Sequence, residues 1–161
     1  MLLCHQGMPD SMQRTLILFK PDCVQRRLVG ALMTRFEQKG LRLVGLKLVR
    51  AGRDLAEKHY AVHKGKPFYE ALVAFITAGP TVAMVWEGRE AVAVARTLMG
   101  TTDGVKAPPG TIRGDYAISI QNNLVHGSDS PENAAAEIAL WFRPEELVDW
   151  APVDTEWVVG K

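Results

Sequence analysis

The sequence reads TLILFKPD over residues 15–22, and this stretch sets the first strand of the fold. Thr15 to Phe19 form a short apolar run typical of a buried strand, and the turn Lys20-Pro21-Asp22 ends it. Apolar residues then recur at helical spacing from Leu28 to Phe36, and Gly40 marks the end of that helix. Residues 41–49 are again rich in strand-forming residues. The pattern therefore predicts a strand, a helix and a second strand.

The rest of the chain continues this alternation. The pattern predicts two short helices, a third strand, a helix, a long loop, a fourth strand and a last helix, over residues 54–60, 68–77, 81–86, 89–99, 101–114, 117–120 and 130–142. Two βαβ halves around one sheet predict the α+β class and a ferredoxin-like βαββαβ sandwich, with helices on one face of a four-stranded antiparallel sheet. Residues 1–13 show no period, so we expect a flexible N-terminal leader there. Residues 14–161 would form one domain that includes a C-terminal tail over 150–161.

The composition is that of an ordinary globular domain. Hydrophobic residues make up 47% of the 161 residues, and 19 Lys and Arg against 18 Asp and Glu leave a net charge of +1. So small a charge gives no field that would gather nucleic acid or an anionic membrane. Two cysteines, Cys4 and Cys23, cannot build a disulfide framework, and no apolar run approaches the roughly 18 residues of a membrane-spanning helix. We therefore expect a cytoplasmic protein.

Several well-known catalytic motifs are missing. The sequence contains no G-x-x-x-x-G-K-[ST] and no G-x-G-x-x-G, which excludes a P-loop and a dinucleotide-binding fingerprint. It also lacks the H-R-D and D-F-G motifs of the common protein kinases. His59 and His63 stand four residues apart, but the glutamate of an H-E-x-x-H motif is absent. We therefore expect a solvated helix face at these two histidines, and no metal ligands.

Two arginines stand where packing alone explains them poorly. Arg96 lies on the apolar stripe of the helix 89–99, so its guanidinium either reaches solvent at the helix edge or faces a bound anion. Arg113 lies in the turn PPGTIRG, residues 108–114, whose glycines allow close backbone approach. A guanidinium can bind a phosphate with two parallel hydrogen bonds. Both side chains are therefore candidate anion ligands.

A histidine precedes the last predicted helix. His126 lies in the stretch NLVHGSDS, residues 123–130, and Glu137 falls on the apolar face of the helix that follows. A carboxylate among apolar groups needs a partner, and an imidazole is a suitable one. A histidine whose second nitrogen is held in this way can act as a covalent nucleophile. From the residues alone, a structural and a catalytic role for His126 remain equally supported.

Taken in order, several motifs resemble those of nucleoside diphosphate kinases. They are KPD at residues 20–22, HY at 59–60, KPFY at 66–69, GP at 79–80, MVWEG at 84–88, PGTIRGD at 109–115 and HGSDS at 126–130. The similarity extends from about Arg14 to Val158 without an evident gap. One such motif would be suggestive, whereas all of them in order make a chance resemblance improbable.

The resemblance implies a nucleoside diphosphate kinase that works by ping-pong transfer through a phosphohistidine at His126. Glu137 and Ser128 would orient His126, and Tyr60 would lie near the transferring phosphate. Mg²⁺ would arrive with the nucleotide and be held mainly by its phosphates. The implied nucleotide ligands are Arg96, Thr102 and Arg113 at the phosphates, Lys20 and Asn123 at the ribose hydroxyls, and Phe68 and Ile120 on either side of the base. Lys20, which is also catalytic, would reach the phosphate region as well.

Three departures from the family pattern stand close to these residues. Cys23 and Arg27 occupy positions where glycine is usual, and Gln121-Asn122 replaces the more familiar Gly-Arg before Asn123. None of them removes a matched group. The alternatives are a nucleotide-binding or protein-interaction module of the same fold with weak catalysis, and a nucleic-acid-binding sheet. The second is disfavoured because no exposed aromatic cluster of the RNA-binding type and no basic excess is present.

The resemblance also implies assembly. Family members form back-to-back dimers that assemble into hexamers or, in some bacteria, tetramers. Residues 151–159 resemble the longer tail of hexameric members, and the turn at residues 106–110 matches a loop that meets its copies at a threefold axis. We therefore expect a homo-hexamer, with a tail folded onto its own subunit as the alternative.

Overall fold

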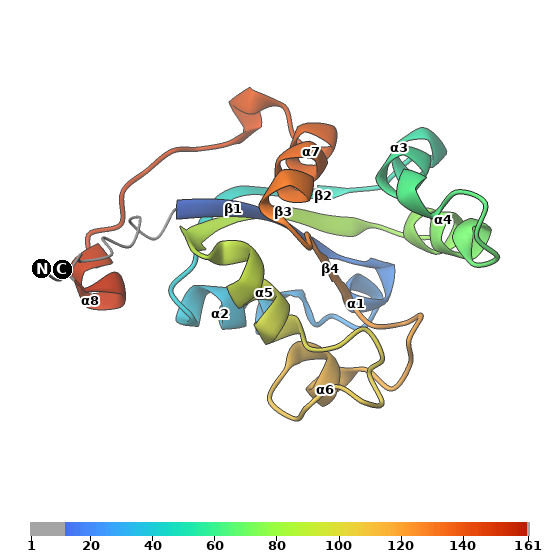
Figure 1. The fold of residues 1–161 in the computed structure, drawn as a ribbon, viewed down its shortest axis with the longest axis horizontal. Coiled ribbons are helices and arrows are strands. Elements are labelled where there is room, and N and C mark those ends of the chain that lie inside the picture. The colour runs from blue at the N-terminus through green and yellow to red at the C-terminus, as the bar shows by residue number, and fades with distance from the viewer. Residues whose placement is uncertain (1–11, 161) are drawn as a thin grey trace, which may run out of the picture.

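A four-stranded antiparallel sheet forms the centre of the computed structural model, which describes residues 12–160 (Figure 1). The strands are β1 (Met12–Phe19), β2 (Arg42–Val49), β3 (Thr81–Arg89) and β4 (Val125–Gly127), in the order β2-β3-β1-β4. Every neighbouring pair is antiparallel. This confirms the ferredoxin-like α+β fold. Met12 and Gln13 belong to β1 rather than to the expected leader, and the leader's other residues lie outside the described part of the chain.

Helices fill the connections between the strands and extend the chain beyond β4. They are α1 (Pro21–Gln25), α2 (Val29–Gln38), α3 (Arg53–His59), α4 (Tyr69–Thr77), α5 (Ala91–Met99), α6 (Ile112–Tyr116), α7 (Pro131–Trp141) and α8 (Thr155–Val159), with short 3₁₀ turns at Ala61–His63 and Pro144–Glu146. Side-chain caps fix the starts of α6 and α7, where Thr111 accepts from the amide of Gly114 and Ser130 from that of Asn133. Within residues 12–160, none of these helices is long and apolar enough to cross a membrane.

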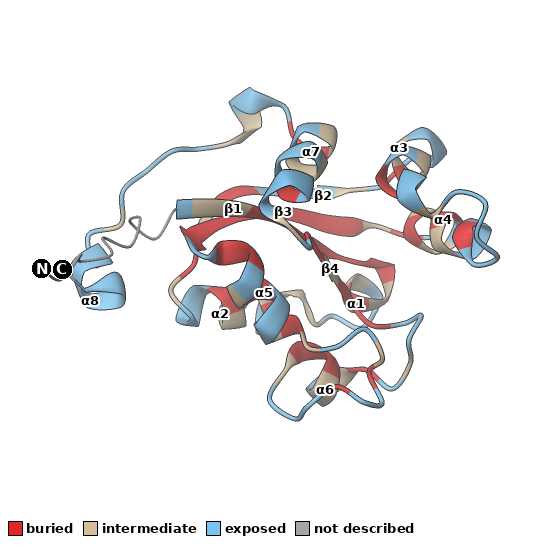
Figure 2. Ribbon diagram, in the orientation of Figure 1, coloured by how far each residue is buried: buried red, intermediate tan, exposed pale blue. Residues whose placement is uncertain are grey.

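Helices cover both faces of the sheet, which corrects the expectation of one covered face. Ile17 and Phe19 of β1 belong to a core with α2 and α5, whereas Leu16 and Leu18 belong to a second core with α4 and α7. β3 is buried at every position except its last. Strands that are apolar on both faces need cover on both, and Figure 2 shows β1 and β3 largely buried between the helices. The two main crossover helices, α2 and α5, do share one face.

The fourth strand is not where the sequence predicted it. Residues 117–120 form no strand, and Ile118 and Ile120 are largely exposed. The strand is the three-residue β4, which pairs with Ile17–Phe19 of β1. So short a strand is defined by its long-range partner rather than by its own residues, because strand propensity depends strongly on context. The error matters for the site, because His126 lies within the strand and not after it.

Candidate active site

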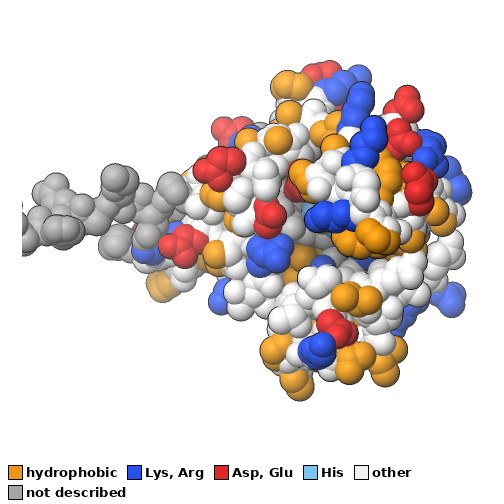
Figure 3. Space-filling view, turned by 45° about the vertical axis from the view of Figure 1, so that its right-hand side comes forward, with side chains coloured by type: hydrophobic (Ala, Val, Ile, Leu, Met, Phe, Trp, Pro, Cys, Tyr) orange, Lys and Arg blue, Asp and Glu red, His pale blue; other side chains and the backbone are white. Residues whose placement is uncertain are grey.

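One cleft gathers most of the candidate residues. It has a volume of about 740 Å³ and lies between α3, α5, the loop before β4, β4 itself and α7. Figure 3 shows this side of the molecule, with Lys and Arg side chains flanking a hollow. Nine of the eleven predicted site residues line the cleft: Lys20, Tyr60, Arg96, Thr102, Arg113, Ile120, Asn123, His126 and Glu137. Ser128 and Phe68 do not line it.

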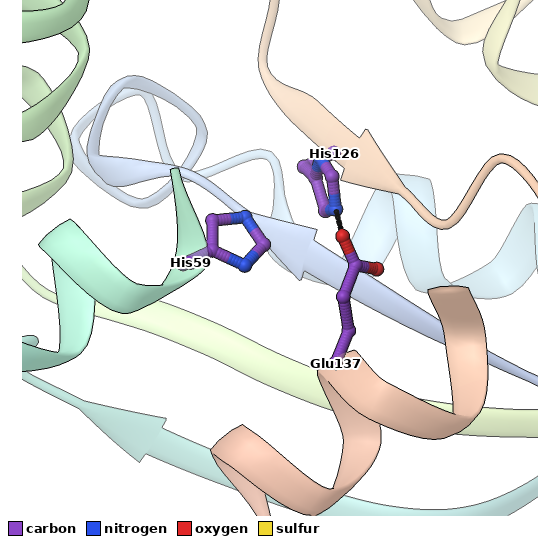
Figure 4. Close-up of side chains that lie close together, drawn as sticks. All are labelled: His59, His126 and Glu137. Carbon is purple, nitrogen blue, oxygen red and sulfur yellow. Dashed lines mark hydrogen bonds and ion pairs between the residues drawn. The ribbon is translucent and has the colours of Figure 1, made fainter. Parts of the chain in front are cut away.

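His126 is held from α7 by a carboxylate. Its Nε2 lies 3.1 Å from Oε1 of Glu137, as Figure 4 shows, and Ser128 Oγ donates to Oε2 of the same carboxylate at 2.5 Å. Ser128 therefore acts from behind Glu137, which explains why it does not line the cleft. Burial raises the pKa of Glu137, but hydrogen bonds from His126 and Ser128 outweigh this and leave the pKa below its usual value.

The ionised Glu137 assigns the tautomer of His126. A carboxylate can only accept hydrogen bonds, so Nε2 of His126 carries the proton that faces it. In the neutral ring the other nitrogen, Nδ1, then keeps its lone pair. The arrangement presents a nucleophilic nitrogen whose opposite N–H is held by a base.

The positive charge of the cleft comes from two arginines, Arg96 and Arg113, and two lysines, Lys20 and Lys58. Arg113 is buried and donates to the carbonyl oxygens of Gly100, Asn123 and Val125, so its guanidinium is fixed by the backbone. Burial and the neighbouring Arg96 lower the pKa of Arg113 to about 10, which leaves it charged at neutral pH. Arg96 is exposed at the edge of α5 and also lines the cleft, so its guanidinium reaches solvent there, and its contact with a bound anion stays a prediction.

Lys20 and Asn123 form a pair at the inner end of the cleft. Lys20 Nζ donates to Asn123 Oδ1 at 2.5 Å and to the carbonyl oxygen of Gln121 at 3.2 Å. Asn123 Nδ2 donates to the carbonyl oxygen of Thr102. Both side chains are buried, and burial lowers the pKa of Lys20 to about 8. The positively charged form of Lys20 is therefore easily lost.

The backbone bends at Leu124, which lies between Asn123 and His126 in the chain. Leu124 is fully buried and adopts a positive φ of 72°, a conformation uncommon outside glycine. Its amide donates to Asp22 Oδ2, and its carbonyl accepts from the amide of Lys20. Strained residues of this kind persist when surrounding contacts hold them, and they cluster at functional sites.

The remaining predicted residues divide into two groups. Tyr60 is buried in the cleft wall, and burial raises the pKa of its phenol to about 12, which keeps it protonated. Ile120 and Phe68, the expected pair around a base, are about half exposed or more. Ile120 lines the cleft, whereas the Phe68 ring lies outside it, 5.5 Å from that of His63. The structure therefore places Ile120 in the lining of the cleft and Phe68 outside it.

Of the three departures from the family pattern, one enters the cleft. Gln121 lines it, and Ser119 Oγ accepts from the amides of Gln121 and Asn122, so the local turn has its own support. Cys23 is fully buried, and burial raises its pKa to about 12, which makes it a poor target for oxidation. Arg27 is exposed with a φ of 57°.

The sequence prediction missed His59. We expected a solvated face, but His59 is 8% exposed, and its ring lies 4.5 Å from that of His126 between centroids. The reason is the contact between α3 and α7, through which Trp141 Nε1 donates to His59 Nδ1 at 3.2 Å. One local signal was available, because Trp141 follows Glu137 by four residues and shares its helix face.

Known proteins match the chain over most of its length. The model of the nucleoside diphosphate kinase family matches residues 13–147. Nucleoside diphosphate kinases of Thermosynechococcus vestitus and Carboxydothermus hydrogenoformans are 60% and 58% identical over 147 residues, which are 91% of this chain and 98% and 99% of theirs. A solved nucleoside diphosphate kinase from Halobacterium salinarum, in complex with CDP, is 51% identical with a TM-score of 0.89. That match covers 92% of this chain and 99% of the halophilic one.

Proposed function

The chain belongs to the nucleoside diphosphate kinase family and is an enzyme of that type, and we propose that it works through a phosphohistidine at His126. In the first half-reaction a nucleoside triphosphate gives its terminal phosphoryl group to His126 and leaves as the diphosphate. In the second half-reaction another diphosphate takes the group from His126. One observation carries this proposal, namely the contact of His126 Nε2 with Glu137, which leaves Nδ1 free to attack.

The transfer can be written from these groups. The lone pair of His126 Nδ1 attacks the terminal phosphorus, the bond from phosphorus to the bridging oxygen breaks, and that oxygen leaves with the diphosphate. The ring gains positive charge as the N–P bond forms. Glu137, held ionised by Ser128, lies 3.1 Å from Nε2 and stabilises that charge. The second half-reaction is the reverse, with the new diphosphate as nucleophile.

The cations of the cleft supply the rest of the catalysis. Phosphoryl transfer needs alignment and charge placement more than covalent chemistry, because charge spreads over the equatorial oxygens. Arg96, Arg113 and Lys20 line the cleft beside His126 and can bind these oxygens. Thr102 and the Tyr60 phenol add hydroxyl groups. Lys20 and Asn123 would exchange their mutual hydrogen bond for bonds to the ribose hydroxyls.

The cleft fits a magnesium ion that arrives with the nucleotide. Its charged lining is mostly cationic, and the carboxylate of Glu137 is already engaged by His126 and Ser128. Asp129, the other lining carboxylate, accepts from Asn133 Nδ2 at 2.6 Å and stands at the exposed rim. When bound, the ion would neutralise phosphate charge, with the phosphates themselves as its main ligands. Ile120 and Phe68 would contact the base without reading its hydrogen-bonding edge.

The proposal extends to assembly and location. We propose a homo-hexamer in the cytoplasm. The edge strand β2, whose Leu46 and Leu48 are exposed, supports the assembly. An edge strand with exposed apolar side chains needs a partner or cover. The cleft does not favour the alternative of a weakly catalytic module, because His126, Glu137 and the cations proposed for transfer all line it.

A labelling experiment tests the proposed reaction. The protein is mixed with ATP labelled at the γ-phosphate and Mg²⁺, and then with GDP. We expect a labelled protein that is acid-labile and alkali-stable, as a phosphoramidate is, and that loses its label to GDP. His126→Ala should form no such species. A labelled His126→Ala protein, or one with near wild-type turnover, would show that the phosphohistidine is assigned wrongly.

A further inference from the structure

His59 has a buried nitrogen that the proposed reaction does not use. The residue is 8% exposed and lines the cleft, yet its Nε2 has no hydrogen-bond partner within residues 12–160. Buried polar atoms are nearly always paired, so an orphan in a functional cleft calls for an explanation. Its other nitrogen, Nδ1, is paired with Trp141 Nε1 at 3.2 Å.

The Trp141 hydrogen bond fixes the tautomer of His59. An indole N–H can only donate, so Nδ1 of His59 must present its lone pair. The proton of the neutral ring is then on Nε2. Burial lowers the pKa of His59 to about 3, helped by the proximity of His126, so the ring stays neutral at physiological pH. The other titratable groups near it are Glu137 on α7 and His63 in the 3₁₀ turn.

The same hydrogen bond argues against a metal site. His59, His126 and Glu137 each offer one atom within 4.8 Å of the others, which is a spacing that could hold an ion. A metal on Nε2 of His59 would need the lone pair there and the proton on Nδ1. That proton would then face the indole N–H of Trp141. The pairing therefore makes His59 a fixed donor and not a metal ligand.

The ring of His59 is wedged among three other rings. It meets those of Tyr60, His126 and Trp141 edge to face, at centroid distances of 4.7, 4.5 and 5.5 Å. Figure 4 shows His59 and Glu137 approaching His126 from different elements, α3 and α7. One hydrogen bond to Glu137 leaves the His126 ring free to rock about that bond. An uncharged ring packed edge to face, with its centroid 4.5 Å away, limits this motion and adds no positive charge beside the nucleophile.

We propose that His59 is a positioning residue for His126: Trp141 locks its imidazole in one tautomer, and the locked ring keeps Nδ1 of His126 turned toward the cleft. The inference rests on the proposed role of His126. It assigns a task to two residues that the proposed reaction does not use. Because misplacement of a reacting group lowers rate more than binding, the effect should fall on the transfer step.

The test uses a matched pair of tryptophan substitutions. Trp141→Phe keeps an aromatic ring, removes the donor to His59 and makes this buried side chain smaller. Trp150→Phe removes an indole donor in the same way, here to the carbonyl of Leu43, and Trp150 does not line the cleft. We expect Trp141→Phe to lower the single-turnover rate of His126 phosphorylation roughly tenfold. The ATP concentration at half-maximal rate should change by less than about twofold, because the phosphate ligands are intact. Trp150→Phe should leave both values unchanged.

Histidine ring ¹⁵N NMR gives a readout independent of turnover. In the wild-type protein His59 should show the Nε2–H tautomer alone and should not titrate between about pH 5 and 8. In Trp141→Phe it should show both tautomers. His59→Gln retains an acceptor for Trp141, so its phosphorylation rate should be higher than that of His59→Phe. This second pair of variants tests the positioning role if Trp141→Phe does not fold.

Three results would overturn the inference alone. They are a wild-type rate in Trp141→Phe, equal rates in His59→Gln and His59→Phe, and a loss confined to ATP affinity. Binding of Zn²⁺ with simultaneous shifts of the His59 and His126 signals would overturn the donor assignment. A wild-type protein that forms no phosphoenzyme would instead overturn the proposed function, and this inference with it.

Discussion

At the scale of single residues, the charge of Lys20 is set by its burial. Burial lowers its pKa to about 8, while Asp22 raises it and Arg113 lowers it. Lys20 is thus positive below pH 8 and neutral above it. Because a nucleotide phosphate favours the charged form, nucleotide binding weakens as pH rises through this value. We expect kcat/KM, which reports the free enzyme, to fall up to about tenfold per pH unit above pH 8.

The pH profile of a variant checks this prediction. Lys20→Met should have a lower kcat/KM at pH 7 and no decline centred on pH 8. The wild-type kcat should decline only at higher pH, because bound phosphates raise the pKa of Lys20 in the complex. A wild-type profile of kcat/KM that stays level to pH 10 would contradict the assignment of this limb to Lys20.

The backbone conformation of Arg27 lowers the stability of the fold at this one residue. Its φ of 57° lies in the left-handed region, and its side chain is exposed. The left-handed conformation costs an ordinary residue about 1–2 kcal/mol, and glycine avoids this at an entropic cost of its own. Arg27→Gly should therefore raise the free energy of unfolding by about 0.5–1 kcal/mol in urea denaturation. Arg27→Ala keeps the strain and should give no gain.

At the scale of elements, β4 depends on a close approach to its neighbours. A Cβ placed on Gly127 would lie 2.6 Å from Met99 Sδ and 3.0 Å from Ile17 Cδ1, so the buried side chain of Met99 must shift to admit a methyl group there. We expect Gly127→Ala to lower the free energy of unfolding by about 1–3 kcal/mol and to reduce activity, because His126 is the preceding residue. Denaturation and steady-state turnover measure the two effects.

Gly30→Ala is a control for which we expect the opposite change in the free energy of unfolding. It lies in α2, and a Cβ added there meets nothing within 4 Å. Gly30→Ala should therefore raise the free energy of unfolding by about 0.5–1 kcal/mol, as alanine does in an exposed helix, and leave turnover unchanged. If Gly127→Ala is as stable and active as the parent, β4 has more room than the structure shows.

Elements also differ in how far the sequence predicts them. β1 and α2 follow from residue patterns, because a buried strand and an amphipathic helix carry their period locally. β4 does not, because three residues hold no period, and its identity comes from pairing with Ile17–Phe19 of β1. The residues of the site also differ in whether a local pattern predicts them. His126 and Glu137 share a local motif, whereas His59 joins them only through contact of α3 with α7.

At the scale of the whole molecule, the C-terminal segment first follows β2 and then makes fewer contacts with the rest of the chain. Val148 donates to the carbonyl of Val44, and Trp150 Nε1 donates to that of Leu43, so this part is attached to β2. Beyond it α8 stands apart from the sheet (Figure 1), with Trp157 88% exposed. Val158 reaches Gly40 but is still about half exposed. The tail thus has a weak contact with the rest of the chain, and Trp157, Val158 and Val159 present an exposed apolar surface.

We expect that surface to be buried by a neighbouring subunit in a hexamer. An exposed tryptophan and valine pair forms an apolar patch, and burying such area stabilises association by roughly 25 cal/mol per Å² before the costs of ordering. Light scattering on the full chain at micromolar concentration should therefore give six times the chain mass. A chain that ends at Trp150 should keep its attachment to β2 but give a smaller assembly. A full chain that stays a monomer or dimer would contradict the assembly, and a tetramer would mean that the tail does not bridge subunits.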